Sequence, residues 1–569
     1  MSVNALYELW LSKVTDAELL AELKVAAGNA EDINDRFFQT LAFGTGGLRG
    51  VIGAGTNRMN IYTVGLASQA LAAWVLENGR SKSVAIGYDS RIKSDVFART
   101  AAAVLAANGV KVYIYPELVP TPCVSWAVRE LGCDSGIVIT ASHNPAKYNG
   151  FKCYAPEGYQ MTDEGAAQIE ALMRSFDIFD DVRHGDFEKL LAEGTIEYIG
   201  QEVMDRFLDA VASASVNPGV CKDSGMKVIY TPLCGTGNKP VRAILNKIGV
   251  DDVTVVACQE LPDGNFPRAP FPNPEIREAF EASLELTETV PADLLLATDP
   301  DCDRVGIAVR TPEGEYKLLS GNETGALMLD YVLSQRKANG TLPAAPLAVK
   351  TIVTSVLAEK IAAAYGCELR NVLTGFKYIG EIVTDLEKDG EADRFVMGYE
   401  ESYGYLFGSH VRDKDAVVAS MMICEMAAYY KKNEGKSLLQ KLDELYSKYG
   451  FCRHGLINIT FEGESGMKQM AAIMDNLRTN PPAEVAGAAV IGRRDYLNSV
   501  AYEADGEKEI KLPKSNVMEF LLADGGAFIA RPSGTEPKIK FYLTAVESTD
   551  EAALDRIAVL DKAVREIVG

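Results

Sequence analysis

The feature that most constrains the fold is an alternation of short apolar runs with longer helical patterns. The first series contains V-A-I-G-Y at 84–88, a helical pattern over 94–108, V-Y-I-Y at 112–115 and I-V-I-T at 137–140. Apolar runs separated by helices are typical of mostly parallel sheets that are covered on both faces. Similar apolar runs recur downstream at 227–232, 292–298, 347–353, 368–374 and 395–399. We therefore expect several α/β units of similar size.

The length of the chain and the pattern of its apolar residues indicate several domains. At 569 residues it is too long for a single hydrophobic core. From about residue 450 the pattern changes to short strands, charged turns and a closing helix, which favours a smaller α+β domain. We expect an N-terminal helical extension within the first domain. The predicted domains are residues 1–215, 216–318, 319–445 and 446–569.

The acidic composition limits the partners of the protein. With 57 basic and 79 acidic residues, the formal net charge is −22, so nucleic acid and anionic membranes are not expected partners. An anionic substrate must therefore meet a local group of cations or backbone N–H groups. The ten cysteines form no C-x-x-C pair, and the first residues lack the pattern of a signal peptide. We expect a reduced, cytoplasmic protein.

Four polar stretches each follow directly after an apolar run. Ligands in open α/β sheets bind at the carboxyl ends of strands, so these stretches are candidate site loops. They are T-A-S-H-N-P at 140–145, T-D-P-D-C-D-R at 298–304, Y-E-E-S-Y-G at 399–404 and R-P-S-G-T-E-P at 531–537.

The second of these loops carries three alternating carboxylates. Asp299, Asp301 and Asp303 can converge on one hard cation, Mg²⁺ or Ca²⁺. An EF-hand is excluded, because Arg304 and Arg310 stand where that loop needs glycine and glutamate. Two alternatives stay open: a phosphatase of the haloacid dehalogenase type, with Asp299 as nucleophile, and an acidic surface turn.

Ser142 allows three interpretations: a hydrolase nucleophile, a phosphoryl carrier or a polar turn. The pattern G-x-S-x-G is absent around it. The side chain of His143 is expected to diverge from that of Ser142 on an extended loop, which disfavours a Ser-His triad. Beside a divalent cation, the hydroxyl can instead hold a phosphoryl group.

The remaining loops suit a phosphorylated polyol. In the last loop, two hydroxyls, a glycine that allows close backbone approach and one guanidinium form a phosphate-binding pattern, although an ordinary turn is the alternative. Glu400 and Ser402 can recognise sugar hydroxyls, or belong to a solvated loop. Further candidates for anion contacts or proton transfer are Arg49, Lys377, His410, Arg412 and Lys414.

Taken together, these stretches resemble the α-D-phosphohexomutase superfamily over nearly the whole chain. The four loops are similar to its phosphoserine, metal, sugar and phosphate loops, in that order. Y-N-G-F-K-C-Y, S-G-N-E-T-G and L-T-G-F-K-Y-I-G resemble the phosphoglucomutase branch, which also contains phosphopentomutases. The resemblance implies an α/β protein of four domains around a central cleft. Three are similar mixed α/β domains, and the C-terminal one is an α+β domain like the phosphatase/TATA-box-protein fold.

The resemblance also implies a reaction. We expect a phosphoglucomutase, an isomerase that interconverts glucose 1-phosphate and glucose 6-phosphate through a phosphoserine and glucose 1,6-bisphosphate, with Mg²⁺. A phosphopentomutase or phosphomannomutase is the alternative within the superfamily, and a Mg²⁺-dependent sugar phosphatase or a non-catalytic scaffold lies outside it. The expected partners are small sugar phosphates, and the expected state is a monomer or homodimer.

The resemblance assigns roles to individual residues. The implied catalytic residues are Ser142, His143, Lys414, Arg49 and Lys152. The implied metal ligands are Ser142, Asp299, Asp301 and Asp303. The implied substrate contacts are Arg304, Lys377, Glu400, Ser402, His410, Arg531, Ser533, Gly534 and Thr535. The candidates for the general base are Lys414, His410 and His143.

Two cysteines depart from the pattern. Cys302 stands where the metal loop commonly carries a small residue, and we expect its thiol to be open to oxidation. Cys234 stands where the superfamily often has histidine, so any role of that imidazole is missing here. Neither change removes an expected metal ligand.

Overall fold

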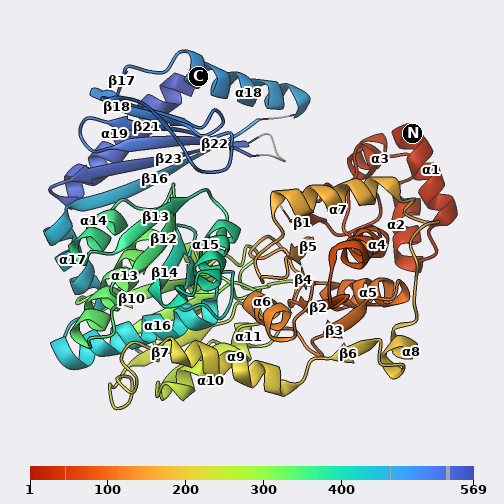
Figure 1. Cartoon of the computed structure of the whole chain (residues 1–569), viewed down its shortest axis with the longest axis horizontal. Coiled ribbons are helices and arrows are strands. Elements are labelled where there is room, and N and C mark those ends of the chain that lie inside the picture. Colours follow the sequence, from red (N-terminus) through yellow and green to blue (C-terminus); the bar gives the residue numbers. More distant parts are fainter. Residues whose placement is uncertain (45, 462, 534–537, 569) are drawn as a thin grey trace. The chain divides into compact units, whose positions relative to one another are not determined.

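The computed structural model describes residues 1–44, 46–461, 463–533 and 538–568 (Figure 1). The chain forms two compact units: residues 1–324 with 376–437, and residues 325–375 with 438–569. Within the described residues, no helix has both the length and the apolar character needed to cross a bilayer.

A six-stranded sheet forms the centre of the first domain. Its strands are β1 (Gly47–Val51), β2 (Ser83–Tyr88), β3 (Lys111–Ile114), β4 (Ser135–Ile139), β5 (Tyr148–Tyr154) and β6 (Ile196–Tyr198). They lie in the order β1-β5-β4-β2-β3-β6. Strands β4, β2, β3 and β6 run parallel to one another, whereas β5 is antiparallel to both β4 and β1. The loops after β2 and β4 therefore leave the same edge of the sheet side by side.

Helices cover both faces of this sheet. They are α4 (Ile61–Asn78), α5 (Ser94–Ala107), α6 (Thr121–Glu130), α7 (Asp163–Ser175), α8 (Phe187–Ala192) and α9 (Gln201–Ser213). Ile86 and Ile137 point into the core that includes residues of α4 and α5. Gly87 and Gly136 face the other way, where a Cβ atom would overlap Val124 and Val128 of α6, respectively. Bare backbone at these two positions lets α6 lie close to the sheet, and burial on both faces explains the continuous apolar runs.

Three short helices form the N-terminal extension: α1 (Val3–Lys13), α2 (Ala17–Ala26) and α3 (Ala30–Phe37). The side chains of Ser2, Asp16 and Asn29 cap their first turns. Trp10 is fully buried, and its ring packs edge-on against Phe37 and Phe179 at 5.7 and 5.4 Å. This aromatic cluster attaches the extension to the first domain, because Phe179 lies beyond α7.

A five-stranded sheet forms the second domain. Its strands are β7 (Lys227–Thr231), β8 (Asp252–Val255), β9 (Leu294–Thr298), β10 (Val305–Arg310) and β11 (Tyr316–Leu319), in the order β11-β10-β9-β7-β8. Its helical segments are α10 (Asn238–Lys247), α11 (Ala257–Glu260), the 3-10 turn η1 (Arg277–Phe280) and α12 (Glu281–Thr287). All five residues of β9 are buried, so the aspartates that follow them start at a fixed point. β9 and β10 form an antiparallel hairpin, and the aspartates occupy its turn.

The first unit also includes residues 376–437. Strands β14 (Phe395–Glu400) and β15 (Gly404–Leu406) form an antiparallel hairpin. The helical elements here are α15 (Phe376–Lys388), η2 (Ala392–Arg394), α16 (Ala416–Tyr429) and η3 (Tyr430–Glu434). The carboxylate of Asp415 accepts hydrogen bonds from the backbone N–H groups of Val417 and Val418, at 2.8 and 3.1 Å, and so caps α16.

The second unit begins within α13 (Gly321–Ala338). It contains the parallel strands β12 (Leu347–Thr351) and β13 (Glu368–Val372), with α14 (Leu357–Ala364) and α17 (Leu438–Tyr449). Its C-terminal sheet has the path β16-β23-β22-β21-β18-β19-β20, with β17 paired to β18. These strands are β16 (Phe451–Thr460), β17 (Glu484–Val485), β18 (Ala488–Asp495), β19 (Val500–Glu503), β20 (Gly506–Glu509), β21 (Met518–Leu522), β22 (Ala527–Pro532) and β23 (Lys538–Glu547).

Two helices cover one face of the C-terminal sheet: α18 (Gly463–Thr479) and α19 (Asp550–Val568). The inward residues of β23 alternate along the strand, and they share one core with side chains of both helices. Phe520 and Phe528 stack at the centre of this core with ring centroids 4.5 Å apart. Within the described residues, the paired strands from β16 to β23 are antiparallel, as the change of pattern after residue 450 predicts.

The predicted fold class is confirmed: mixed α/β sheets are followed by a C-terminal domain of mainly antiparallel strands. The parallel pairing expected from the sequence holds among β2, β3 and β4. It does not hold for β5 or β10, because each of these two strands follows the preceding strand through a short connection and pairs with it as an antiparallel hairpin. The exact domain boundaries given above stay predictions.

Candidate active site

The site is built around the loop after β4, which carries Ser142. The serine has φ of +53°, in the left-handed region that costs a non-glycine residue roughly 1–3 kcal/mol. Its N–H donates to Oγ1 of Thr140 at 2.8 Å. The side chain is buried, and its Oγ donates to Oδ2 of Asp299 at 2.9 Å. The hydroxyl of the first domain is therefore directed at the aspartate loop of the second.

His143 does not diverge from Ser142, so that expectation is wrong. Its Nδ1 lies 3.1 Å from Oγ of Ser142, because the left-handed turn at the serine brings the two side chains to the same side of the loop. Burial, together with the charges of Arg304 and Arg49, holds the pKa of His143 well below its usual value. A Ser-His-Asp triad still does not form here, since Asp299 accepts its hydrogen bond from the serine and not from the histidine.

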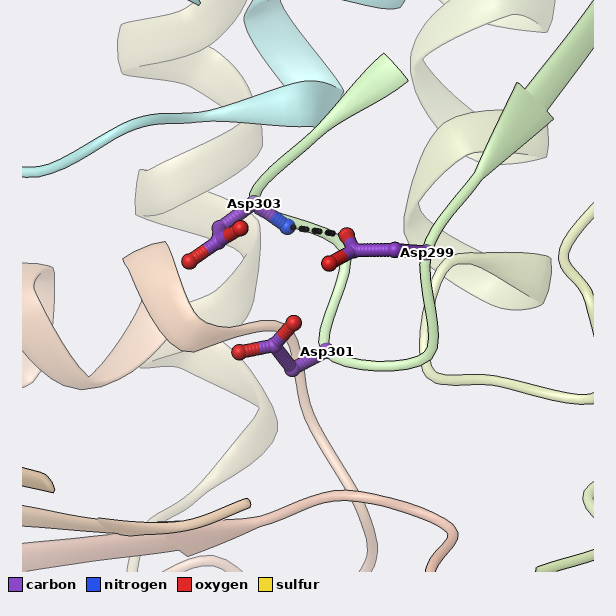
Figure 2. Close-up of side chains that lie close together, drawn as sticks. All are labelled: Asp299, Asp301 and Asp303. Atoms are coloured by element: carbon purple, nitrogen blue, oxygen red, sulfur yellow. Dashed lines mark hydrogen bonds between the residues drawn. The ribbon is translucent and has the colours of Figure 1, made fainter. Parts of the chain in front are cut away.

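The three aspartates converge at the turn between β9 and β10 (Figure 2). Asp299, Asp301 and Asp303 are all buried, and each offers one oxygen within 4.8 Å of the other two. Oδ1 of Asp299 accepts hydrogen bonds from the N–H groups of Asp303 and Arg304, at 3.1 and 3.0 Å, which fixes the turn. The burial of three carboxylates in one turn is unfavourable unless cations compensate their charge.

Two lysines provide part of that compensation. Nζ of Lys152, on β5, lies 2.7 Å from Oδ2 of Asp301 and 3.0 Å from Oδ2 of Asp303. Nζ of Lys414 lies 3.3 Å from Oδ2 of Asp303. In contrast, the buried Oδ1 atoms of Asp301 and Asp303 accept no hydrogen bond from the described residues. Oxygen donors left in this state fit a hard divalent cation such as Mg²⁺.

The electrostatics of the turn are strongly coupled. Burial and the neighbouring charges of Asp301 and Asp303 raise the pKa of Asp299 well above its usual value. Burial alone would also raise the pKa of Asp301, but the charge of Lys152, together with hydrogen bonds to Lys152, Asp299 and Thr121, lowers that pKa. Burial would lower the pKa of Lys414, whereas Asp303 and Asp413 raise it above its usual value. Lys414 is therefore a cation at neutral pH.

The two unusual cysteines are buried thiols. Cys302 is fully buried, and burial with the nearby charge of Asp299 raises the pKa of its thiol well above the usual value. Burial raises the pKa of Cys234 to about 11. Because the thiolate is the form that oxidises, the expected oxidation sensitivity of Cys302 is not supported.

The loop between β14 and β15 adjoins the aspartate turn. Glu400 ends β14 and is buried, while Ser402 is half-buried. The guanidinium of Arg304 donates from Nη1 to the carbonyl of Ser402 at 3.0 Å and to the carboxylate of Glu275 at 2.9 Å. The N–H of Val305 also donates to the carbonyl of Tyr403 at 3.1 Å. The predicted metal and sugar loops are therefore brought together.

Two residues near Lys414 are used differently from what the sequence suggests. Nε2 of His410 lies 2.8 Å from Oδ2 of Asp415, so the histidine is bonded to the carboxylate that caps α16. Arg412, considered as an anion contact, is fully buried and donates to Oγ1 of Thr384 at 2.9 Å and to Glu387 at 2.7 Å. These bonds anchor the loop that ends in Lys414.

Two further predicted cations lie on the same unit. The buried Lys377, at the start of α15, pairs with Asp163 at 2.6 Å. Arg49 lies on β1 with an exposed side chain, and its charge acts on His143.

The predicted phosphate loop belongs to the second unit. Arg531 lies on β22, and the N–H of Ser533 donates to the carbonyl of Lys538 at 2.7 Å. Gly534 and Thr535 lie outside the described residues.

Sequence reasoning missed several residues that support the site. Thr121 donates from Oγ1 to Oδ2 of Asp301 at 2.8 Å, and its N–H donates to the Asp301 carbonyl at 2.8 Å. Asp413 accepts from Lys414 at 3.0 Å and from the hydroxyl of Tyr154 at 2.6 Å. The signal for Asp413 was its place beside Lys414, whereas nothing in the sequence links Thr121 to Asp301.

Comparison with protein families decides the family of the chain. Descriptions of phosphoglucomutase/phosphomannomutase α/β/α domains I, II and III match residues 40–177, 205–314 and 320–449, and the C-terminal domain of the same family matches residues 456–560. The chain belongs to the phosphoglucomutase/phosphomannomutase family. This confirms the resemblance to the α-D-phosphohexomutases, whose members are isomerases.

Named relatives of this family member span nearly all of its length. A phosphoglucomutase of Staphylococcus saprophyticus is 34% identical over 95% of this chain and 97% of its own. A phosphoglucomutase of Staphylococcus aureus strain USA300 is 36% identical over 94% of this chain and 95% of its own.

Solved structures of the family share the fold. A phosphoglucomutase/phosphomannomutase family protein of Burkholderia thailandensis has a TM-score of 0.65 and 18% identity, over 92% of this chain and 96% of that one. The open form of Paramecium parafusin, a phosphoglucomutase, has a TM-score of 0.65 and 17% identity, over 93% of this chain and 97% of that one.

The aspartate turn predicts a defect in metal binding. Replacing Asp301 with asparagine removes one anionic ligand, so we expect the affinity for Mg²⁺ to fall at least about tenfold, measured by isothermal titration calorimetry. Asp293→Asn is the matched control, because Asp293 precedes β9 at the end opposite to Asp299. Equal affinities for Mg²⁺ in Asp301→Asn and in the unsubstituted protein would contradict this assignment.

Proposed function

We propose that the protein is a phosphoglucomutase that interconverts glucose 1-phosphate and glucose 6-phosphate, with Ser142 as the phosphoryl carrier. The observation that carries the proposal is the buried contact of 2.9 Å between Oγ of Ser142 and Oδ2 of Asp299 within the aspartate turn. A hydroxyl beside clustered cation ligands is suited to hold a phosphoryl group, and the relatives named phosphoglucomutase support glucose as the sugar.

The proposed reaction exchanges P–O bonds in two steps. In the first, the bond between phosphorus and Oγ of Ser142 breaks, and a bond forms to the free hydroxyl of glucose 1-phosphate, whose proton passes to a base. The product is glucose 1,6-bisphosphate. The intermediate then reorients in the site. The bond between phosphorus and the oxygen on C1 breaks, a bond forms from phosphorus to Oγ of Ser142, and the serine proton passes to the sugar oxygen, which leaves glucose 6-phosphate and a phosphorylated enzyme.

We assign the cation site to Asp299, Asp301, Asp303 and the phosphorylated Ser142. Bound Mg²⁺ supplies positive charge to the phosphoryl oxygens during transfer. The ammonium groups of Lys152 and Lys414 offset the remaining negative charge of the turn, since their Nζ atoms lie 2.7 Å from Asp301 and 3.3 Å from Asp303, respectively.

We assign the sugar and the second phosphate to the other predicted loops. Glu400 and Ser402 are proposed to accept and donate hydrogen bonds to sugar hydroxyls, with Arg304 fixing their loop through the Ser402 carbonyl. The proposed contacts for phosphate groups are Arg49, Lys377, Arg531, Ser533, Gly534 and Thr535. His410 stays a proposed substrate contact through its second ring nitrogen, because Nε2 is bonded to Asp415.

His143 is favoured over Lys414 as the general base. A base must be unprotonated, and the low pKa of His143 keeps its imidazole neutral, whereas the raised pKa of Lys414 keeps its amine charged. Nδ1 of His143 also lies 3.1 Å from Oγ of Ser142, the atom that takes part in both transfers.

The main rival from another class is a phosphatase with Asp299 as nucleophile. Both oxygens of Asp299 are engaged: Oδ1 with two backbone N–H groups and Oδ2 with Ser142. A carboxylate held in this way is poorly placed to attack phosphorus, which favours the serine. We also propose that the enzyme is cytoplasmic, that it is a monomer or homodimer, and that its partners are small sugar phosphates.

The carrier role predicts the effect of removing one hydroxyl. Ser142→Ala is expected to lower kcat for glucose 1-phosphate at least about 1,000-fold, because no acceptor for the phosphoryl group is left, in a coupled assay of glucose 6-phosphate formation. Ser175→Ala is the control, since Ser175 is an exposed serine at the end of α7. Turnover of Ser142→Ala at the rate of the control would exclude the carrier role.

The choice of sugar predicts an order of substrates. With a trace of glucose 1,6-bisphosphate in each assay, kcat/KM is expected to be at least about tenfold higher for glucose 1-phosphate than for mannose 1-phosphate or ribose 1-phosphate. A preference for ribose 1-phosphate would make the protein a phosphopentomutase, and a preference for mannose 1-phosphate a phosphomannomutase. Either result leaves the role of Ser142 intact.

A further inference from the structure

A second polar segment lies beside the Ser142 loop. Residues 89–94, D-S-R-I-K-S, directly follow β2, and β2 is the parallel neighbour of β4 with Tyr88 opposite Ile139. The N–H of Asp89 donates to the carbonyl of Ile139 at 3.1 Å. The two loops therefore start as a continuation of the same sheet, and residues 89–94 have no part in the chemistry described above.

Arg91 of this segment donates hydrogen bonds to several backbone carbonyls of the Ser142 loop. Its side chain is fully buried. Nη1 donates to the carbonyls of Pro145 and Tyr148 at 3.0 and 3.1 Å, and Nη2 donates to the carbonyls of Ser142 and Asn144. Three carbonyls of the loop, and that of Tyr148 at the start of β5, thus point at one guanidinium. One of them belongs to Ser142, the proposed phosphoryl carrier.

Asp89 and Phe266 orient the guanidinium. Oδ2 of Asp89 lies 3.3 Å from Nε of Arg91 as an ion pair, although Nε donates no hydrogen bond within the described residues. Oδ1 of Asp89 accepts from the N–H of Arg91 at 2.9 Å and from Oγ of Ser94 at 2.8 Å. The ring of Phe266 lies 5.1 Å from Cζ of Arg91 and covers its face. The arginine therefore has a single orientation.

This arrangement matches a need of the loop. Ser142 adopts a left-handed backbone, with φ of +53°, and in this conformation Oγ is directed at Asp299 while His143 lies on the same side. A phosphoryl group on Oγ adds negative charge that pulls on the loop during each transfer. Only arginine presents a planar fork of five donors, so a lysine at position 91 keeps the charge but cannot hold four carbonyls.

We propose that Arg91 is the positioning residue for the phosphoryl carrier: it fixes the Ser142 loop through three carbonyls of the loop and that of Tyr148 at its end, so that Oγ stays aligned with the aspartate turn. The inference rests on the proposed role of Ser142. Arg91 contacts the serine only through the backbone carbonyl, so it acts on the geometry of transfer and not on the binding of the sugar.

The test is Arg91→Lys in the full-length protein, with glucose 1-phosphate as substrate. We expect kcat to fall about 100-fold, because a displacement of the carrier by about 1 Å has an effect of that size, while KM changes less than about threefold. The rate at which glucose 1,6-bisphosphate phosphorylates Ser142, followed by intact mass in a quenched reaction, should fall by the same factor as kcat. The final occupancy of Ser142 should equal that of the unsubstituted protein.

Arg58→Lys is the matched control. Arg58 is another buried arginine, and its Nη1 donates to the carbonyls of Asp35 and Asn57 at 3.1 and 3.0 Å, in a part of the first unit that carries no proposed site residue. A general loss of folding would lower activity in both variants in proportion to the loss of folded protein, measured by circular dichroism. Equal kcat values in the two lysine variants, after correction for the folded fraction, would overturn the proposal.

Asp89→Asn provides a second test if Arg91→Lys does not fold. It keeps the shape of the side chain but places an amide toward Nε of Arg91, so kcat should fall about tenfold with KM unchanged. A kcat within twofold of the unsubstituted protein would overturn the proposal. Failure of the carrier role itself would look different, because the unsubstituted protein would then take up no phosphate on Ser142.

Discussion

The hydrogen bond between Ser142 and Asp299, 2.9 Å long, is the contact on which the site depends. It joins the loop after β4 of the first domain to the turn after β9 of the second. Each side of the contact is built independently: the left-handed turn at Ser142 rests on Thr140 and on the sheet edge, and the turn at Asp299 rests on the N–H groups of two later residues. Two rigid strand ends therefore place one hydroxyl beside three carboxylates.

The cost of burying these carboxylates explains the surrounding charges. Lys152 and Lys414 offset part of the negative charge of Asp301 and Asp303, and Arg304 lies beside the same turn. Two buried carboxylate oxygens are still without a hydrogen-bond donor among the described residues. A divalent cation and a phosphoryl group on the serine would complete this set, which is the physical link between the geometry and phosphoryl transfer.

Much of the site could be predicted from the sequence, because the end of a strand can be recognised from the residues next to it in the chain. The buried run before Asp299 and the β-branched run before Ser142 place both residues at carboxyl ends of strands. Pairings between distant residues could not be predicted: Lys152 meets Asp301 across 149 positions of sequence. Arg412 reads as an exposed cation in sequence but is fully buried, because its partners Thr384 and Glu387 come from α15. The divergence expected for His143 failed because it assumed an extended loop, whereas Ser142 is left-handed.

The most direct test of the account is to locate the phosphate on the enzyme. The purified protein would be incubated with glucose 1,6-bisphosphate, quenched, and analysed by intact mass and peptide mapping under conditions that preserve acyl phosphates. The account predicts one phosphate per chain, on Oγ of Ser142. A phosphate on the carboxylate of Asp299, or a protein that turns over substrate while Ser142 stays unmodified, would contradict it.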